Sequence, residues 1–352
     1  MSRIGKVAAA FYISQKSIVM GKTDTARINE KLRFQRNRIL SFIRKSGGAG
    51  RLFIARQLRI SNSRVCDIVQ EMLDSGLIIE ENSGKERRGR RSVPLRVNPD
   101  YGQLVGFDME SKMMRVISVD FSGKIIWQRE SSLSGDLKRD ELIDRILAFI
   151  EWNLKKLRRK RKKILGIGLA AAGIIDVKQG VILHYDLIKG ARDIPLKDII
   201  SKQFELSVCV EENIRALTLA EWIEGAGVDY NNFICFAVRS GLGCGMVIQG
   251  KLYAGANGLA GDVGSIVLPF ESGRAKKVQL YDRASENALD LRESDPDFSK
   301  LDKKRIRSTG NLLGSTIGML VTIFDPGAVI LAGNLLAREN PLWPYISKTY
   351  NA

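Results

Sequence analysis

The sequence predicts an α/β protein that carries a winged helix-turn-helix at its amino-terminal end. Positive charge is concentrated in the first 100 residues, where three short amphipathic segments are followed by a basic hairpin. From residue 103 onward, strand-like apolar runs alternate with helical patterns. We therefore expect an amino-terminal extension at 1–30, a winged helix-turn-helix domain at 31–98 and a larger α/β domain at 99–352.

The three amphipathic segments predict three helices. In 31–47, KLRFQRNRILSFIRKSG, apolar side chains recur at helical spacing, and 51–59, RLFIARQLR, predicts a shorter second helix. The third helix begins at Ser61, a residue favoured at helix N-caps, and ends at Gly76. Its apolar stripe, which faces the first two helices, is formed by Val65, Ile68, Val69 and Met72.

A short hairpin follows the third helix and completes the predicted winged domain. The strands LIIEE and SVPLRVN flank a turn that carries five basic side chains, Lys85, Arg87, Arg88, Arg90 and Arg91. In a winged helix the third helix enters the major groove with its first residues. The residues expected to face DNA there are Ser61, Asn62, Ser63 and Arg64. Arg64 could contact guanine in a bidentate manner, and the hairpin arginines could contact phosphates.

The charge distribution favours this interpretation over a solvated turn on a generic helical bundle. The first 100 residues hold 21 Lys and Arg against 9 Asp and Glu, a balance of +12, and the whole chain carries +17. One end of the chain is thus suited to a polyanion, and double-stranded DNA is the expected partner. A hairpin that meets RNA or a protein remains the alternative. The second basic run, KKLRRKRKK at 155–163, is expected to be a solvated helix end.

The composition excludes several other classes of protein. Four widely spaced cysteines indicate reduced thiols, and the single histidine, His184, argues against a metal site or a Ser-His-Asp triad. No run of apolar residues is long enough to span a membrane, and the amino terminus lacks a signal-peptide pattern. We expect a cytoplasmic protein without a metal or a cofactor.

The larger domain shows an internal repetition. Residues 104–126 and 232–254 both read as strands joined by tight turns. A helix is expected at about 138–157, before the apolar strand ILGIGLAAAG, and FELSVCVEENIRALTLAEWIEG reads as a strand that leads into a helix. This pattern predicts a mixed α/β domain of two related halves.

Several ordered motifs between residue 31 and about residue 335 resemble the ROK family, named for repressors, open reading frames and kinases. They are GRRSVPLRVNPDYGQLVGFD, GIGLAAAGIIDVKQGVI, VCVEENIRALTLAE, SGLGCGMVIQGKLYAGANGLAGDVGS and FDPGAVILAGNL. The resemblance implies a winged helix followed by an actin-like (ribonuclease H-like) two-lobed ATPase/sugar-kinase domain. Relative to that family the second lobe is expected to be short at its carboxyl end, because the chain stops at Ala352.

The sequence departs from the kinases of this family at two catalytic positions. The family's Asn-Asp pair falls on Glu212 and Asn213, and an amide cannot act as the general base near neutral pH. The first phosphate loop reads Asp108-Met-Glu110-Ser-Lys, without its two glycines. A carboxylate about 4 Å from a phosphate costs on the order of 4 kcal/mol at an effective dielectric of about 20. We therefore expect no kinase activity and no catalytic residue.

The sugar loop, GANGLAGDVGS at 255–265, keeps its glycine frame but not its family side chains. The family's glutamate and histidine fall on Asp262 and Ser265, and its next sugar-binding glutamate falls on Tyr281. No cysteine follows the loop, so the family's zinc site is not expected. Candidate sugar-binding residues are Glu212, Asn213, Asn257, Asp262 and Ser265. The loop either senses a sugar, amino sugar or sugar phosphate, or has become purely structural.

The resemblance implies a transcriptional regulator, expected to be a repressor of carbohydrate genes that binds an operator as a homodimer or higher homo-oligomer. A sugar or sugar phosphate would act as the effector. The alternative from another class is an ATP-dependent sugar kinase with an accessory DNA-binding domain, which Asn213 and Glu110 argue against.

Overall fold

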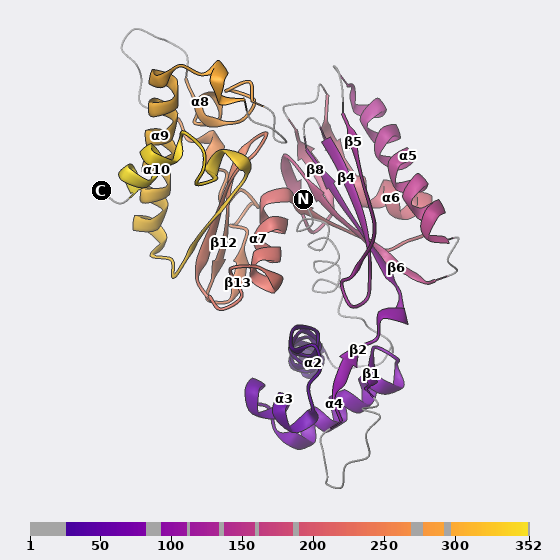
Figure 1. Cartoon of the computed structure of the whole chain (residues 1–352). Helices are drawn as coiled ribbons and strands as arrows, with labels where there is room; N and C mark the ends of the chain where they lie inside the picture. The colour runs from indigo at the N-terminus through magenta and orange to yellow at the C-terminus, as the bar shows by residue number, and fades with distance from the viewer. Residues whose placement is uncertain are drawn as a thin grey trace.

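A computed structural model describes residues 26–81, 93–110, 113–133, 137–158, 162–185, 190–268, 277–291 and 297–350. It confirms the predicted fold class, an amino-terminal helical domain followed by a two-lobed α/β domain. Figure 1 shows the small amino-terminal domain beneath two larger lobes that lie side by side.

The amino-terminal domain contains the three predicted helices and the two strands of the hairpin. The helices are α2 (Ala26–Ser46), α3 (Arg51–Leu58) and α4 (Asn62–Asp74), and the strands are β1 (Ile78–Glu80) and β2 (Leu95–Val97). The strands pair antiparallel, with Ile78 opposite Val97. The described part of α2 already includes Ala26, five residues before the start expected from the apolar pattern. Arg59 takes a left-handed conformation, with a φ of 53°, and thereby makes the turn between α3 and α4.

The first lobe is built on a five-stranded sheet with the order β10-β6-β3-β4-β5. Its elements are β3 (Gln103–Met109), β4 (Met113–Asp120), β5 (Ile125–Ser132), α5 (Arg139–Arg158), β6 (Ile164–Ala171), α6 (Leu196–Phe204) and β10 (Val208–Glu212). A small second sheet consists of β7 (Ile174–Asp176), β8 (Val181–His184) and β9 (Arg192–Ile194). Within the main sheet, β3 pairs antiparallel with β4 and parallel with β6.

The second lobe repeats this scheme, as the two related strand patterns predicted. Its sheet has the order β13-β12-β11-β14, and β11 pairs antiparallel with β12 and parallel with β14. The elements are α7 (Asn213–Glu224), β11 (Phe233–Val238), β12 (Leu242–Ile248), β13 (Lys251–Tyr253), α8 (Tyr281–Ala284), α9 (Lys303–Phe324), β14 (Val329–Ala332) and α10 (Trp343–Tyr350). Short 3₁₀ turns lie at 99–101, 263–265, 298–300 and 334–336.

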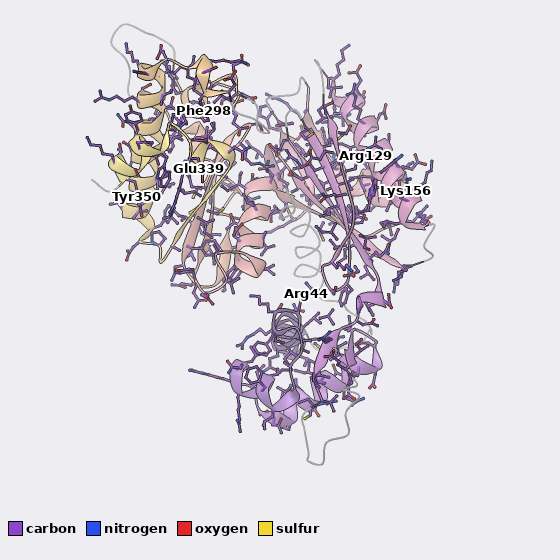
Figure 2. The ribbon with its side chains drawn as sticks, viewed as in Figure 1. Arg44, Arg129, Lys156, Phe298, Glu339 and Tyr350 are labelled. Atoms are coloured by element: carbon purple, nitrogen blue, oxygen red, sulfur yellow. The ribbon has the colours of Figure 1, made fainter. Side chains whose placement is uncertain are left out.

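The amino-terminal domain shares a hydrophobic core with the first lobe. Buried Ile39 and Val65 of the helices belong to the same cluster as Ile117 and Phe121 of the sheet lobe. Arg44 of α2 donates a hydrogen bond to the carbonyl oxygen of Phe121 over 3.0 Å, and its guanidinium lies 5.7 Å from the centre of the Phe121 ring. Figure 2 shows Arg44 at this junction. The domain is therefore packed against the lobe and not merely tethered to it.

Other sequence expectations can be compared with the described part of the chain. No described helix is both long and apolar enough to cross a membrane. The four cysteines are free thiols. Burial raises the pKa of the Cys244 thiol to about 12, which makes this thiol inert near neutral pH. In the same residues, no group of three or more His, Cys, Asp or Glu side chains is arranged to hold a metal ion.

Candidate functional site

The first residues of α4 form an exposed polar surface on the amino-terminal domain. Asn62 and Ser63 are exposed, whereas Arg64 is half-buried and its Nε lies 3.4 Å from Oε1 of Gln35 on α2. Ser61 occupies the N-cap position, but its hydroxyl makes no cap bond and lies 3.5 Å from the Ser63 hydroxyl. Two hydroxyl groups and an amide are thus available at the end of the helix expected to meet base edges.

The hairpin residues Lys85, Arg87, Arg88, Arg90 and Arg91 lie outside the described residues. The structure adds two basic side chains that the sequence reasoning did not single out. Arg56 and Arg59 are exposed at the turn that leads from α3 into α4. The only sequence signal for them was the charge of the second segment, because the turn geometry that exposes Arg59 depends on its left-handed backbone.

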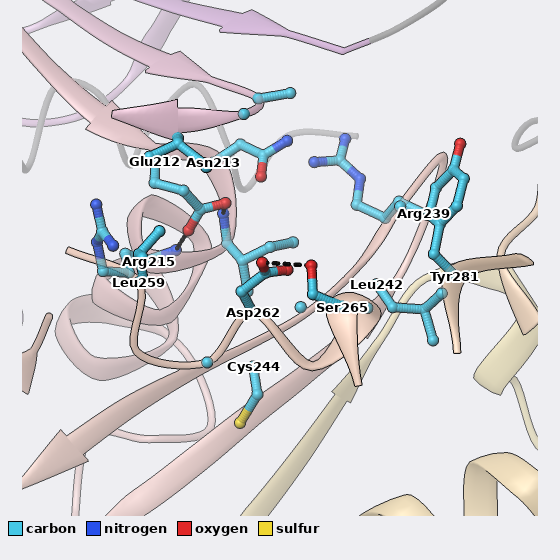
Figure 3. Close-up of a pocket in the computed structure, with 18 of the residues that line it drawn as sticks. Glu212, Asn213, Arg215, Arg239, Leu242, Cys244, Leu259, Asp262, Ser265 and Tyr281 are labelled. Carbon is cyan, nitrogen blue, oxygen red and sulfur yellow. Dashed lines mark hydrogen bonds between the residues drawn. The ribbon is translucent and has the colours of Figure 1, made fainter. Parts of the chain in front are cut away.

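A cavity of about 450 Å³ lies between the two lobes. Ala172, His184 and Tyr185 of the first lobe contribute to its wall, and most of the remaining lining comes from α7 and the loops of the second lobe. Four of the five predicted sugar-binding residues line it, namely Glu212, Asn213, Asp262 and Ser265. Asn257 is exposed and does not line the cavity. Figure 3 shows the four lining residues around the same space.

Glu212 is held by the helix that it precedes. Its two carboxylate oxygens accept hydrogen bonds from the backbone nitrogens of Ile214 and Arg215, each over 2.8 Å, so it caps the amino terminus of α7. Burial raises the pKa of Glu212 from 4.5 to about 7, although these bonds and the charge of Arg215 act in the opposite direction. The carboxyl group of Glu212 is therefore committed to the helix, and it titrates near neutral pH.

Arg215 secures the sugar loop against α7. Its Nε donates to Glu211 over 2.8 Å, and its Nη1 donates to the carbonyl oxygen of Gly258 over 2.6 Å. Among the described residues, its buried Nη2 has no hydrogen-bond partner. The sequence reasoning missed this residue because its role depends on contact with a loop 43 positions away.

The glycine loop itself is fixed by close backbone contact. The Cys244 nitrogen donates to the carbonyl oxygen of Gly261 over 2.8 Å, and Gly261 has a φ of +88°. A Cβ at this position would collide with the Cys244 carbonyl group, so only glycine fits. Beyond it, the Ser265 hydroxyl donates to Asp262 over 2.7 Å. Asp262 and Ser265 are thus hydrogen-bonded to each other while they face the cavity (Figure 3).

Asp108 and Glu110, at the carboxyl end of β3, form ion pairs that join the lobes. Arg239, at the end of β11, contacts Asp108 over 3.3 Å and also pairs with Glu110. Arg115 of β4 contacts the same two carboxylates, over 3.3 Å and 2.6 Å. The Ser240 hydroxyl donates to Glu110 over 3.4 Å. Figure 3 shows the guanidinium of Arg239 directed toward the side chain of Asn213 across the cavity.

The repeated sheet scheme, the cavity between the lobes and the glycine loop define a sugar-kinase-like domain, here preceded by a winged helix-turn-helix. The model of the ROK family matches residues 104–352. The chain belongs to the ROK family.

Curated relatives include transcriptional regulators. The putative xylose repressor of Caldicellulosiruptor sp. (strain Rt8B.4) is 28% identical over 79% of this chain and 77% of its own length. The DNA-binding transcriptional dual regulator NagC of Escherichia coli K12 is 22% identical over 89% of this chain and 83% of its own length.

Solved structures share the fold. A ROK family transcriptional regulator described as a homologue of the E. coli MLC protein matches with a TM-score of 0.74 and 21% identity, over 90% of this chain and 87% of its own. The ROK family glucokinase of Streptomyces griseus, solved with glucose and AMPPNP, matches with a TM-score of 0.59 and 23% identity. The match to this glucokinase extends over 71% of this chain and 88% of the glucokinase chain. The regulator thus matches more of this chain than the kinase does.

Proposed function

We propose that this protein is a DNA-binding transcriptional repressor of sugar-metabolism genes. The observation that carries the proposal is a helix-turn-helix domain packed onto a sugar-kinase fold whose catalytic positions are replaced. The names of the curated relatives, a putative xylose repressor and the regulator NagC, support it.

In this proposal α4 reads the operator in the major groove. Asn62 and Ser63 are exposed at its amino terminus and contact base edges, and Arg64 reaches guanine once it leaves Gln35. The hairpin arginines contact phosphates, together with Arg56 and Arg59 on the same domain. Phosphate contacts of this kind set affinity and salt dependence more than sequence choice.

The protein acts as a homodimer or higher homo-oligomer in the cytoplasm. Helix-turn-helix dimers place two recognition helices on half-sites about 34 Å apart, and a single copy offers only one such helix in its described residues. Cytoplasmic location follows from the proposed contact with genomic DNA.

Phosphoryl transfer is not part of the proposed function. Asn213 lines the cavity where the kinases of this fold have an aspartate, and an amide cannot take the proton of an attacking hydroxyl. Glu110 and Arg239 occupy the phosphate position with an internal ion pair. The amide at position 213 and the Glu110–Arg239 ion pair therefore both argue against phosphoryl transfer in this cavity.

The cavity binds a sugar effector that is linked to DNA affinity. Asn213, Asp262 and Ser265 present an amide, a carboxylate and a hydroxyl to a space of about 450 Å³, which suits the hydroxyl groups of a monosaccharide. Binding that favours one arrangement of the lobes changes the position of the attached DNA-binding domain. The effector thereby weakens the match between two winged helices and their half-sites.

The experiment that tests this function is selection of genomic fragments by the purified full-length protein. Enriched fragments should share a pseudo-palindromic site, and the Asn62→Ala variant should lose the enrichment while its thermal melting is unchanged. Met319→Ala, an exposed change on α9, is the matched control and should enrich the same fragments. If single-stranded RNA competes better than duplex DNA, or no fragment is enriched at low salt, the proposal is wrong.

A further inference from the structure

The strongest feature that the proposed function leaves unexplained is the buried charge cluster between the lobes. The side chains of Asp108 and Glu110 are only 3% and 2% exposed, and that of Arg239 is 6% exposed. Buried charges are costly unless they are paired, and removal of one partner typically costs about 3–5 kcal/mol. The cluster is therefore a specific arrangement and not a chance surface contact.

Among the described residues, the charged cluster contains more carboxylates than guanidinium groups. Arg115 also contacts Glu130 over 3.4 Å, so that three carboxylates face the two guanidinium groups of Arg115 and Arg239. Arg239 lines the cavity, so a phosphate that paired with Arg239 would have to displace Glu110 from it or lie beside Glu110. A like-charge contact at about 4 Å costs on the order of 4 kcal/mol at an effective dielectric of about 20.

The opposite wall of the cavity offers groups that suit neutral hydroxyls. Asn213 can donate and accept hydrogen bonds, and the Asp262–Ser265 pair has further accepting capacity. The guanidinium of Arg239 points toward Asn213 (Figure 3), and its charge is paired with Asp108 and Glu110. The polar lining can thus hydrogen-bond an uncharged polyol, whereas an anion at Arg239 would compete with the carboxylates that already pair with this arginine.

We propose that Glu110, supported by Asp108, is a built-in substitute for a ligand phosphate, which restricts the cavity to uncharged sugars. Selectivity of this kind depends on a repulsive group placed against the wrong ligand. The inference rests on the proposed role of the cavity as a sugar site, and it narrows that role by rejecting both sugar phosphates and nucleotides. Glu110 is then a specificity-determining residue, and Arg239 positions it.

Isothermal titration of the full-length protein with inorganic phosphate tests the inference without knowledge of the sugar. Glu110→Gln removes one negative charge and leaves both arginines, so this variant should bind phosphate at least tenfold more tightly than the wild type. Glucose and glucose 6-phosphate, and xylose as a second neutral probe, are titrated in parallel. The wild type should bind no phosphorylated probe, and Glu110→Gln should gain affinity for glucose 6-phosphate.

Two further variants keep the test decisive. Asp108→Asn makes the same change of charge at the neighbouring carboxylate and replaces Glu110→Gln if that variant fails to fold. Glu151→Gln, at the exposed ion pair with Lys155 on α5, is the matched control and should behave like the wild type.

The inference is overturned if the wild type binds phosphate or glucose 6-phosphate as tightly as Glu110→Gln does. It is equally overturned if neither charge-removing variant gains affinity for phosphate. Fragment selection by the wild type reports separately on the proposed function. Enrichment of DNA together with a failed anion test would refute only the role of Glu110.

Discussion

The titration of Glu212 should make the stability of this protein depend on pH near neutrality. Burial raises the pKa of Glu212 to about 7 in the folded protein, from the ordinary value of 4.5. The folded state therefore holds this proton more tightly than the unfolded state does. The resulting stabilisation is fully present below about pH 4.5 and is lost as the pH rises through about 7.

The size of the effect follows from the two pKa values. One pKa unit corresponds to about 1.4 kcal/mol, so the shift from 4.5 to about 7 sets an upper limit of roughly 3–4 kcal/mol. Because the Glu212 side chain keeps partial access to the cavity, solvent reduces the effect below this limit. Glu212→Gln replaces one of the two oxygens that accept from Ile214 and Arg215 with an amide nitrogen, and the weakened cap adds a contribution that does not depend on pH.

Urea unfolding of the wild type and Glu212→Gln, followed by circular dichroism at several pH values between about 5 and 8, separates the two contributions. The difference in unfolding free energy between the proteins should change with pH, and the wild type should lose stability relative to the variant as the pH rises. A difference that stays constant across this range would refute the assignment of a near-neutral pKa to Glu212.

Three further predictions concern the two functional regions. Asn62→Ala should weaken binding to an enriched fragment by about 1–3 kcal/mol and leave binding to random DNA unchanged, as measured by fluorescence anisotropy; an equal loss on both would argue against base contact. Arg44→Ala removes the bond to the Phe121 carbonyl and should speed hydrogen exchange in α2, and unchanged exchange would show that the junction does not depend on it. Asn213→Asp alone should give no glucose-dependent release of ADP, because Glu110 still fills the phosphate position; turnover in this variant would contradict that role.

Local patterns were sufficient to predict most of the fold. The stripe of Val65, Ile68, Val69 and Met72 defined α4 because a helix that packs on a core must bury one face, and all four side chains are buried. The repeated strand patterns likewise predicted the two sheets, since each first strand contains an apolar run and is buried along its full length. The sheet β7-β8-β9 was not predicted, because strands of three or four residues carry too little periodicity.

The site was predicted only in part, for a physical reason. Of the five residues that the family motifs grouped, Glu212, Asn213, Asp262 and Ser265 line one cavity and Asn257 does not. The motifs could not show that Glu212 caps α7. Arg239 was missed altogether. Its partner Asp108 lies 131 positions away, and such a contact exists only after both lobes have formed. The sequence argument treated Glu110 as a defect of a phosphate loop, whereas the structure gives it two arginine partners.

The shared core provides a route by which the cavity could influence DNA binding. Cys209 of strand β10 packs against the cluster that holds Ile39 and Phe121. The same strand ends at Glu212, on the wall of the cavity. A ligand that contacts Glu212 and the loops of the second lobe can change the position of the lobe that carries this strand. Because the amino-terminal domain is packed against that lobe, it would follow as a unit. Coupling of this kind is reciprocal, so operator DNA must change sugar affinity by the same factor by which the sugar changes operator affinity. A sugar that binds equally well with and without operator would mean that the cavity and α4 are not linked.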